Sequence, residues 1–404
     1  AEIGKEIGVG TVVEGSVRRA ANRIRVTVQV IDVTTQEHLW TAKYDDDLSD
    51  IFAVQSDIAN KVATSLPGSL KISPALVPEL PRPSETEAYL LYLQGQALMW
   101  KQEESSLRQS ISFFEKAIKL DPTYARAYVG VARAYIGLGT EGFLPWMESI
   151  LKGTAAAEKA TALDPDSADA HALLAELSFM ADDLAGRLDV EVRRALALNP
   201  NHAQAQLMLG ALAGALGILE AYVHQSEIAH RLDPLSPQTI RSFGLATFCA
   251  RRFEEAEAHW KKNAEMSPLD CYRGLADLYM FRGDYEQATG AVRELERLAP
   301  NSDYALLCRG YLSALRGDRD TALRCIEKLT ASFSEGYTRQ QLAGFIYFAL
   351  GDLDRFFEYM TAAAKAHTLQ APRIRLSPMF EGARKDPRFV ELISSIFRTV
   401  TVRR

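Results

Sequence analysis

Hydrophobic and polar residues alternate strictly in one stretch near the start of the chain, residues 23–32. The apolar positions there are Ile24, Val26, Val28 and Val30. A period of two predicts a strand of an antiparallel sheet with one buried face. Thr11–Val17 and Glu37–Tyr44 predict two neighbouring strands, joined by turns at residues 18–22 and 34–36, with Asn22 suited to a left-handed turn position.

A helical period follows the third strand. Ser49 is a favoured first residue for a helix, and apolar residues then recur every three or four positions. They are Leu48, Ile51, Phe52, Val54, Ile58 and Val62. Three strands and one helix make a thin core. We therefore expect this segment to pack on the rest of the chain, on a second copy, or on further sequence.

Proline then marks a boundary. Five of the 16 prolines lie between Pro67 and Pro83, and proline fixes φ and removes a hydrogen-bond donor, which predicts an extended linker. Four regions follow from this pattern: a partial α/β domain at 1–66, a linker at 67–84, a helical array at 85–368, and capping helices with a basic tail at 369–404. The capping helices are expected over Ser377–Phe397, with Asp386 and Pro387 at a helix start.

Prolines beyond the linker recur with a period near 34 residues. Pro122, Pro165, Pro200, Pro234, Pro268 and Pro300 are separated by 43, 35, 34, 34 and 32 positions. Helical periodicity fills the intervals between them. Each interval therefore predicts a helix–turn–helix unit that ends at a proline.

The unit that ends at Pro268 shows how the helices should pack. Gly244 and Ala256 are small where two helices cross, and Trp260 is large enough to fill the gap beside them. Such positions agree in phase across many units, and residues 88 to about 368 resemble the tetratricopeptide repeat (TPR) family. The resemblance implies a mainly α fold, a right-handed TPR superhelix of about eight repeats with a C-terminal cap, preceded by the small α/β domain.

In a TPR superhelix the first helix of each unit lines a concave groove. The groove positions of this chain mix aromatic side chains with arginines: Tyr92, Arg126, Arg133, Glu176, Phe179, Arg241, Phe248, Arg273, Met280, Phe281, Tyr311, Phe345 and Phe348. Such a surface suits an extended peptide or an amphipathic helix. The alternative, for part of the set, is ordinary stacking core. Tyr92 and Gln96 stand where chaperone-binding TPR proteins carry a Lys/Asn clamp, which disfavours a receptor for chaperone tails.

The second unit is longer than the others around Glu141–Ser149. This loop carries Phe143, Leu144, Trp146 and Met147. Exposed aromatic side chains are costly unless they are used. The loop therefore either docks a partner or folds back and plugs the superhelix.

The first segment carries a second resemblance. The residues concerned are Gly8–Arg19, Arg23–Asp32, Glu37–Trp40 and Asp47–Phe52. They are similar to the second half of the TolB-N-terminal-like (FlgO-like) domain, which bacteria place before TPR arrays. Those arrays commonly lie C-terminal to a class III adenylate/guanylate cyclase domain or a winged-helix DNA-binding domain. The resemblance implies a regulatory region of a signalling protein and transfers no catalytic residue. Asp46 departs from it, because relatives often have a basic residue there.

Composition narrows the class of protein. The chain has 404 residues, 24% of them charged, and a net charge of −6. This is an ordinary globular composition, and its acidic balance disfavours a general nucleic-acid binder. The four cysteines form no C-x-x-C pair, which predicts reduced core thiols in a cytoplasmic protein. No apolar run reaches the roughly 18 residues of a membrane span. No signal peptide follows Ala1, and we expect the chain to be a piece of a longer protein.

Glycines and histidines do not assemble into a chemical motif. Gly8 and Gly10 lack the third glycine of a dinucleotide-binding loop, and Gly10 with Gly15 lacks the lysine of a phosphate-binding loop. His224 and His230 are six positions apart, which does not match the i, i+4 spacing of a helical metal pair. The sequence therefore predicts no cofactor site.

One acidic cluster remains, at Asp45, Asp46, Asp47 and Asp50. A metal site needs oxygen ligands that converge, whereas acids also favour the positive end of a helix. We interpret the cluster in the second way, and His171 as a core histidine. The sequence thus predicts no catalytic residues and no metal ligands.

The hypotheses for function come from different classes. The first is a protein–protein interaction module that binds a protein or peptide, or an attached signalling domain, and regulates it. The second is the regulatory region of a nucleotide cyclase or of a winged-helix regulator. A third is an envelope assembly factor, by analogy with TolB. Edge strands without neighbours also predict a homodimer through residues 11–45.

Overall fold

The computed structural model describes residues 4, 9–21, 23–47, 51–65, 86–99, 101, 103–181, 183–184, 186–300, 302–331, 339–366 and 371–398. The chain forms two compact units. The first comprises Ala1–Leu91 with Ala117–Tyr124, and the second comprises Tyr92–Lys116 with Ala125–Arg404.

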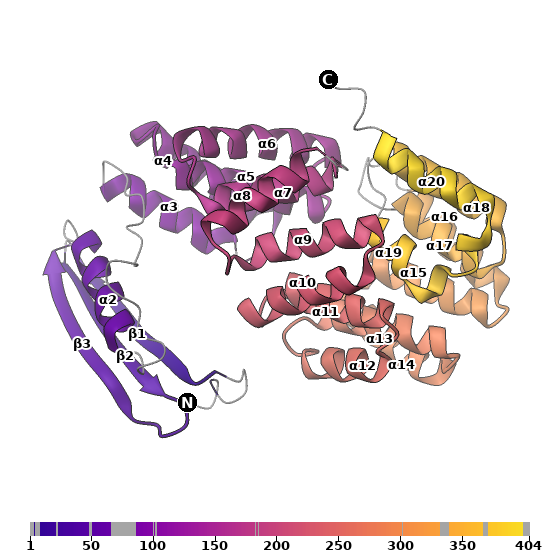
Figure 1. Cartoon of the computed structure of the whole chain (residues 1–404), viewed down its shortest axis with the longest axis horizontal. Helices are drawn as coiled ribbons and strands as arrows, with labels where there is room; N and C mark the ends of the chain where they lie inside the picture. Colours follow the sequence, from indigo (N-terminus) through magenta and orange to yellow (C-terminus); the bar gives the residue numbers. More distant parts are fainter. Residues whose placement is uncertain are drawn as a thin grey trace. The chain divides into compact units, whose positions relative to one another are not determined.

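The first unit contains a three-stranded antiparallel sheet and a helix (Figure 1). Its elements are β1 (Thr11–Ala20), β2 (Arg23–Asp32), β3 (His38–Asp47) and α2 (Ile51–Ser65). Val28 and Val30 of β2 are buried, as the alternation predicts, and α2 packs on β2 and β3 through its buried Val54. The predicted β-β-β-α order is confirmed.

The turns of this sheet use left-handed residues. Ala21 has φ of 53° between β1 and β2, and Gln36 has φ of 62° between β2 and β3. The second turn lies where the sequence predicts it, whereas β1 continues to Ala20, three residues past the predicted Val17, so residues 18–20 of the predicted first turn are strand. The left-handed conformation falls on Ala21, whereas the predicted position, Asn22, lies outside the described residues.

Sixteen helices, α3 to α18, follow among the described residues as eight helix–turn–helix pairs. The pairs are α3 (Thr86–Met99) with α4 (Glu104–Leu120), α5 (Ala125–Thr140) with α6 (Trp146–Leu163), α7 (Ala168–Met180) with α8 (Arg187–Leu198), α9 (Ala203–Leu216) with α10 (Leu219–Leu232), α11 (Pro237–Cys249) with α12 (Phe253–Lys262), α13 (Pro268–Arg282) with α14 (Tyr285–Leu298), α15 (Asp303–Leu315) with α16 (Arg319–Ala331), and α17 (Arg339–Ala349) with α18 (Leu353–Lys365). The mainly α fold of about eight TPR-type repeats is confirmed.

Large side chains on second helices fill gaps left by glycines on first helices. A Cβ on Gly244 would lie 2.1 Å from Trp260 Nε1, and a Cβ on Gly274 would lie 2.2 Å from Trp260 Cε2. Trp260 of α12 is therefore held between α11 and α13, as the sequence predicts for Gly244. Phe114 of α4 fills the same kind of gap between Gly95 and Gly130. This packing joins each pair to the next.

Helix ends follow local sequence signals. Gly217 and Gly283 end α9 and α13 with φ of 82° and 75°, a left-handed conformation that glycine adopts without strain. The side chains of Ser167 and Ser302 accept hydrogen bonds from backbone N–H groups at the starts of α7 and α15. These signals make the second unit a series of short, well-bounded helices.

Four short elements follow α18. They are α19 (Ala371–Leu376), the 3-10 helices η4 (Pro378–Phe380) and η5 (Ala383–Lys385), and α20 (Pro387–Arg398). The last of them, α20, begins at the predicted Pro387 and packs on α18 as a cap. The preceding α19 packs instead on α9, five repeats earlier, and η4 packs on α13. The sequence did not predict that packing.

The long loop of the second repeat folds back. Trp146 is buried as the first residue of α6 and belongs to the core with Val129 and Leu173. Phe143 and Leu144 pack against Leu107 on α4. The loop thus completes the core of its own repeats, and only Met147 of the four side chains is exposed.

Some predicted features lie outside the described residues. They are the linker at 67–84, Leu48, Ser49 and Asp50 before α2, and Arg403 and Arg404 at the end of the chain.

Candidate functional site: the inner face of the repeats

The first helices of neighbouring repeats contact one another: α5 contacts α7, and α7 contacts α9; further along, α11 contacts α13, α13 contacts α15, and α15 contacts α17. We call the surface that they form, together with α3, the inner face. Every predicted groove residue lies on one of these helices: Tyr92 on α3, Arg126 and Arg133 on α5, Glu176 and Phe179 on α7, Arg241 and Phe248 on α11, Arg273, Met280 and Phe281 on α13, Tyr311 on α15, and Phe345 and Phe348 on α17. The structure nevertheless divides them into two groups.

The first group forms what we call the polar half of the inner face: Tyr92, Arg126, Arg133, Asp169, Glu176, His202 and Arg241. The guanidinium carbon of Arg126 lies 5.2 Å from the centroid of the Tyr92 ring. Arg133 Nη2 lies 3.9 Å from Asp169 Oδ1, and His202 Nε2 lies 2.9 Å from the same oxygen. These contacts connect α3, α5, α7 and the N-cap of α9.

Asp169 is the centre of this arrangement. The hydrogen bond from His202 lowers the pKa of the Asp169 carboxyl, and the nearby Arg133 lowers it further. His202 Nδ1 accepts a hydrogen bond from the Ala205 backbone N–H, so Nε2 carries the proton that is donated to Asp169. The carboxylate is therefore fixed in position and in charge on the inner face.

Glu176 lies deeper on the same face. Burial raises the pKa of the Glu176 carboxyl, while the charges of Arg133 and Arg241 and the amides of Gln238 and Gln204 act to lower it. Arg241 also lies 3.6 Å from Asp270, measured from Nη1 to Oδ1. The polar half thus presents arginines, carboxylates and amides that can bind the backbone and side chains of a peptide.

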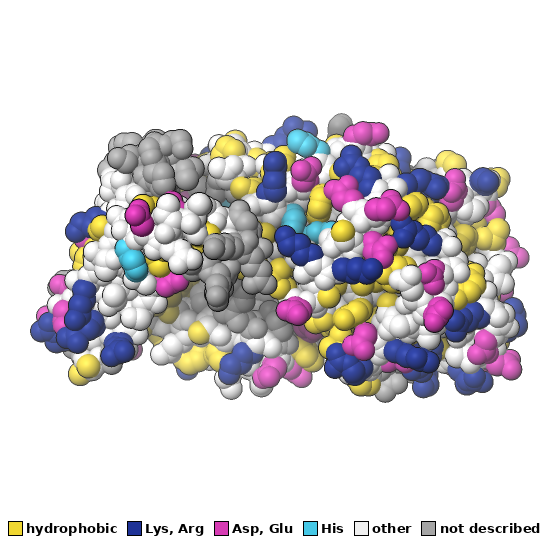
Figure 2. All heavy atoms as spheres, turned by 90° about the horizontal axis from the view of Figure 1, so that it is seen from below, with side chains coloured by type: hydrophobic (Ala, Val, Ile, Leu, Met, Phe, Trp, Pro, Cys, Tyr) yellow, Lys and Arg dark blue, Asp and Glu magenta, His cyan; other side chains and the backbone are white. Residues whose placement is uncertain are grey.

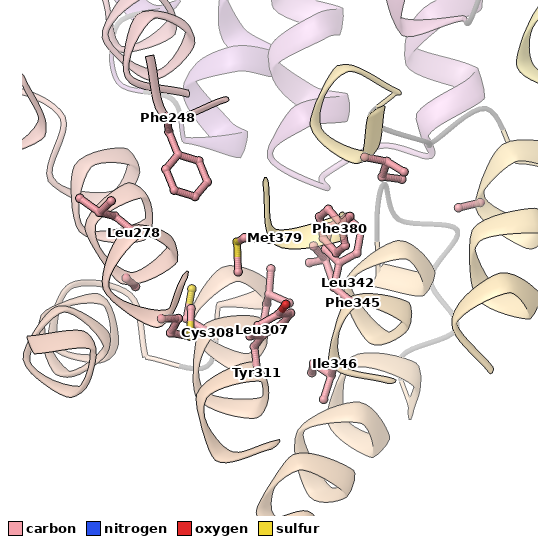
Figure 3. Close-up of a cluster of buried hydrophobic side chains, with 14 of the residues drawn as sticks. Phe248, Leu278, Leu307, Cys308, Tyr311, Leu342, Phe345, Ile346, Met379 and Phe380 are labelled. Atoms are coloured by element: carbon pink, nitrogen blue, oxygen red, sulfur yellow. The ribbon is translucent and has the colours of Figure 1, made fainter. Parts of the chain in front are cut away.

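The second group is the aromatic half of the inner face: Phe248, Arg273, Asp277, Met280, Tyr311, Phe345 and Phe348. All of these side chains except Phe348 are less than 9% exposed. Residues 371–386 of the same chain, which we call the C-terminal segment, lie over them. Figure 3 shows Met379 and Phe380 of this segment among side chains from α11, α13, α15 and α17. The aromatic half is therefore covered by the protein itself.

Two predicted residues stand apart from both groups. Phe281 packs against Phe253 of α12, with ring centroids 5.3 Å apart, and Arg251 lies 5.9 Å from its ring. Phe179 is partly buried against the main core of the array. Both contribute to packing between repeats.

Sequence reasoning missed three residues of the inner face: Asp169, His202 and Asp277. Asp277 carried a usable signal, because it is a lone carboxylate within the apolar run Leu275–Met280 of a first helix. A charge at such a position needs a buried partner. That partner, Arg373, lies in a region for which the sequence predicted only capping helices.

Three residues of the acidic cluster, Asp45, Asp46 and Asp47, lie at the end of β3. Asp45 forms ion pairs with Arg23 and Arg25 of the neighbouring β2. Hydrogen bonds from Arg25 and Arg23 lower the pKa of the Asp45 carboxyl. The arginines of β2 therefore balance the charge of Asp45, whereas Asp50 of the cluster lies outside the described residues. His171, interpreted as a core residue, is mostly buried and lies 2.6 Å from Glu191 of α8.

Charged side chains of both signs are interspersed over the face of the repeats that is visible in Figure 2. Among the described residues, no group of three or more His, Cys, Asp or Glu side chains could hold a metal ion. Within the same residues, no helix combines the length and apolar character that crossing a membrane requires.

No protein-family model matches the sequence. A relative named "Putative adenylate cyclase 3", from Rhizobium meliloti (strain 1021), is 34% identical over 131 residues, which are 32% of this chain and 22% of the relative. The chain thus spans about a fifth of the length of that relative.

Solved structures are similar in fold. Human IFIT1, solved as a dimer with m7Gppp-AAAA, is 15% identical with a TM-score of 0.52, over 78% of this chain and 77% of IFIT1. YrrB, described as a TPR protein with an unusual peptide-binding site, is 18% identical with a TM-score of 0.33, over 48% of this chain and 95% of YrrB. PilF of Pseudomonas aeruginosa is 22% identical with a TM-score of 0.40, over 52% of this chain and 94% of PilF. At these identities the likeness concerns the fold alone.

Proposed function

We propose that this chain is a protein–protein interaction module of a cytoplasmic bacterial signalling protein, and that its helical repeats bind a peptide or a helix on the inner face. One observation carries the proposal. Arg126, Arg133 and Glu176 converge with Tyr92 on the polar half, from successive first helices. Successive first helices are the arrangement through which repeat proteins read an extended partner.

Crosslinking of the protein in cells, followed by identification of the partner, tests this proposal. We expect Arg126→Gln with Arg133→Gln to reduce the yield of the specific crosslink at least tenfold, because both guanidinium groups leave the polar half. Arg193→Gln with Arg194→Gln is the matched control, since these arginines lie on the second helix α8 and are well exposed. Equal losses in both double variants, or no partner at all, would contradict the proposal.

We further propose that the parent protein is a nucleotide cyclase and that this chain regulates it. The relative named as a putative adenylate cyclase supports this proposal, as does the resemblance of residues 1–66 to the TolB-N-terminal-like domain. In a chain that includes the cyclase domain, Arg126→Gln with Arg133→Gln should change the response of cyclic-nucleotide formation to the partner while basal formation stays the same. Finding a winged-helix domain in the parent protein would instead favour control of transcription.

Homodimerisation through the first unit is a separate proposal. β1 is an outer strand of the three-stranded sheet among the described residues, and its Val13 and Val17 are 53% and 69% exposed. Long apolar edge strands are prone to pair with another chain. Light scattering during size-exclusion chromatography should give a dimer that Val17→Lys converts to a monomer. A monomeric wild-type protein would refute it.

A further inference from the structure

The position of the C-terminal segment departs from the rule that governs repeat arrays. In such arrays each repeat contacts its neighbours only. Here Arg375 Nη1 donates a hydrogen bond of 2.9 Å to the Ala215 carbonyl oxygen, across 160 positions of sequence. Glu381 forms an ion pair of 2.7 Å with Arg251 of the α11–α12 turn. The segment therefore lies on the inner face as a ligand would, and not in the place of a ninth repeat.

One anchor of the segment is charged. Arg373 Nη2 lies 2.7 Å from Asp277 Oδ2, and the two side chains are only 4% and 8% exposed. The guanidinium of Arg373 also lies 5.4 Å from the centroid of the Phe345 ring. A buried ion pair gains little net stability, because removing both charges from water is costly. What it contributes is selectivity, since only an arginine or lysine side chain satisfies Asp277 at this site.

The second anchor is aromatic. The Phe380 ring lies 4.5 Å from the Phe345 ring, 5.4 Å from that of Phe348, and 6.2 Å from that of Phe356, measured between centroids. Phe380 is 1% exposed. Aromatic side chains in such pockets dominate the affinity of many protein interfaces. Arginine and phenylalanine are thus seven positions apart in one short segment.

The inner face is shaped to receive this backbone. On α9, a Cβ at Gly214 would lie 3.0 Å from Pro372 Cβ, and a Cβ at Gly217 would lie 2.5 Å from Arg375 Nε. Two glycines therefore let the segment approach α9 closely. Peptide-binding sites combine the same three features: a charged anchor, an apolar anchor, and small residues under the peptide backbone.

We propose that the C-terminal segment is an intramolecular ligand of the aromatic half, and that a partner protein binds there by displacing it with a segment of the same chemistry. That chemistry is an arginine for Asp277 and, seven positions later, a large aromatic side chain for Phe345, Phe348 and Phe356. The inference rests on the proposed function and names the partner's chemistry. The tethered C-terminal segment competes at a high effective concentration. A partner segment therefore binds only to the fraction of molecules in which the C-terminal segment has left the aromatic half, and its apparent affinity falls by that fraction.

A reversible tether tests the inference on the full chain. In the variant Gly214→Cys with Pro372→Cys, the two Cβ atoms would lie 3.0 Å apart, and a further separation of a few tenths of an ångström brings them to the roughly 3.5 Å that a disulfide needs. The four native cysteines are all buried and form no disulfide, so the introduced pair, whose Cβ atoms are adjacent, is the one that oxidises. The probe is a fluorescein-labelled synthetic peptide with the sequence of residues 371–386, and its binding is followed by fluorescence anisotropy.

We expect the reduced protein to bind the peptide and the oxidised protein to bind it at least tenfold more weakly, with the same circular dichroism for both forms. In the reduced background, Arg373→Gln should tighten binding about tenfold, because the intramolecular competitor loses its charged anchor. A peptide in which glutamate replaces that arginine should not bind. Equal binding by the oxidised and reduced forms, or no binding by either, would overturn the inference.

The failure of this inference can be told apart from that of the proposed function. The test is a partner whose crosslink is lost in Arg126→Gln with Arg133→Gln. If oxidised and reduced protein gave the same yield of that crosslink, the proposed interaction module would stand, but displacement of the C-terminal segment would be excluded.

Discussion

The polar and aromatic halves of the inner face are both built from first helices of the repeats, the polar half mainly from α3, α5 and α7 and the aromatic half from α11, α13, α15 and α17, yet they are in opposite states. In the polar half, Arg133 and Asp169 form a partly exposed ion pair. In the aromatic half, Arg373 and Asp277 form a buried one. Screening by water makes the exposed pair nearly neutral for stability, whereas the buried pair tolerates no loss of either partner. The same two types of side chain are therefore partly exposed to solvent in one half and buried in the other.

The substitution Asp277→Asn should have the largest effect on the free energy of unfolding and so distinguish the two halves most clearly. The change leaves the buried guanidinium of Arg373 without its counter-charge, and we expect the free energy of unfolding to fall by about 3 kcal/mol. Denaturation followed by circular dichroism measures it. A loss below about 1 kcal/mol would mean that the segment is not held by this pair and would remove the contrast between the halves.

A smaller effect should separate two glycines with the same backbone conformation. Gly217 and Gly283 both have positive φ, and only Gly217 faces the C-terminal segment. Gly283→Ala should cost about 1–2 kcal/mol from the backbone alone. Gly217→Ala should cost roughly 1 kcal/mol more, because it disturbs the hydrogen bond from Arg375 to Ala215. Equal losses, compared by thermal denaturation, would show that the segment does not rest on α9 in solution.

Acid should weaken the region between the halves. His230 stacks on Phe243 and lies edge-on to His259, and burial lowers the pKa of His230 to about 4. The unfolded chain takes up this proton near pH 6.5, so the contribution to stability is complete above pH 6.5 and is lost as the pH falls toward 4. We expect a loss of about 2 kcal/mol for this partly exposed side chain.

Unfolding at pH 7.5 and pH 5, compared between wild type and His230→Leu, measures the acid effect. The variant should lose less stability between these two pH values than the wild type does. The same pH dependence in both proteins would assign the effect to other groups.

The smallest effect is expected from Glu176→Gln, which makes in the polar half the same change as Asp277→Asn makes in the aromatic half. Burial raises the pKa of Glu176. The folded state therefore favours the protonated acid, and stability falls as the pH rises through the folded pKa. Glutamine avoids that loss, so at pH 7 the variant should be within about 0.5 kcal/mol of the wild type or slightly more stable.

The pH dependence supplies the check for Glu176→Gln. The difference between variant and wild type should shrink as the pH approaches 4. A loss of several kcal/mol at pH 7 would show that Glu176 is held by an ion pair as strongly as Asp277 is.

Much of the fold could be predicted because its signals are local. The alternation of apolar and polar residues in β2 predicted the sheet, and the spacing of the prolines predicted the repeats. Gly244 and Trp260 revealed how two helices cross, because their sizes complement each other across one turn. The candidate site was predictable only as a set of first-helix positions. Some of these positions are exposed and others are covered by the C-terminal segment. Arg373 and Phe380 decide which are covered, and their packing partners are far away in the sequence.

The sequence by itself determined the helices and their pairing, since each of these follows from a period of a few residues or from one repeat length. Only the tertiary structure decided that the aromatic half is covered. That contact joins α19 to α9 and η4 to α13, and it depends on how several repeats together curve the inner face. No local pattern in residues 371–386 shows that they pack on helices so far away in the sequence. The folded chain was therefore needed to see that this segment covers the aromatic half.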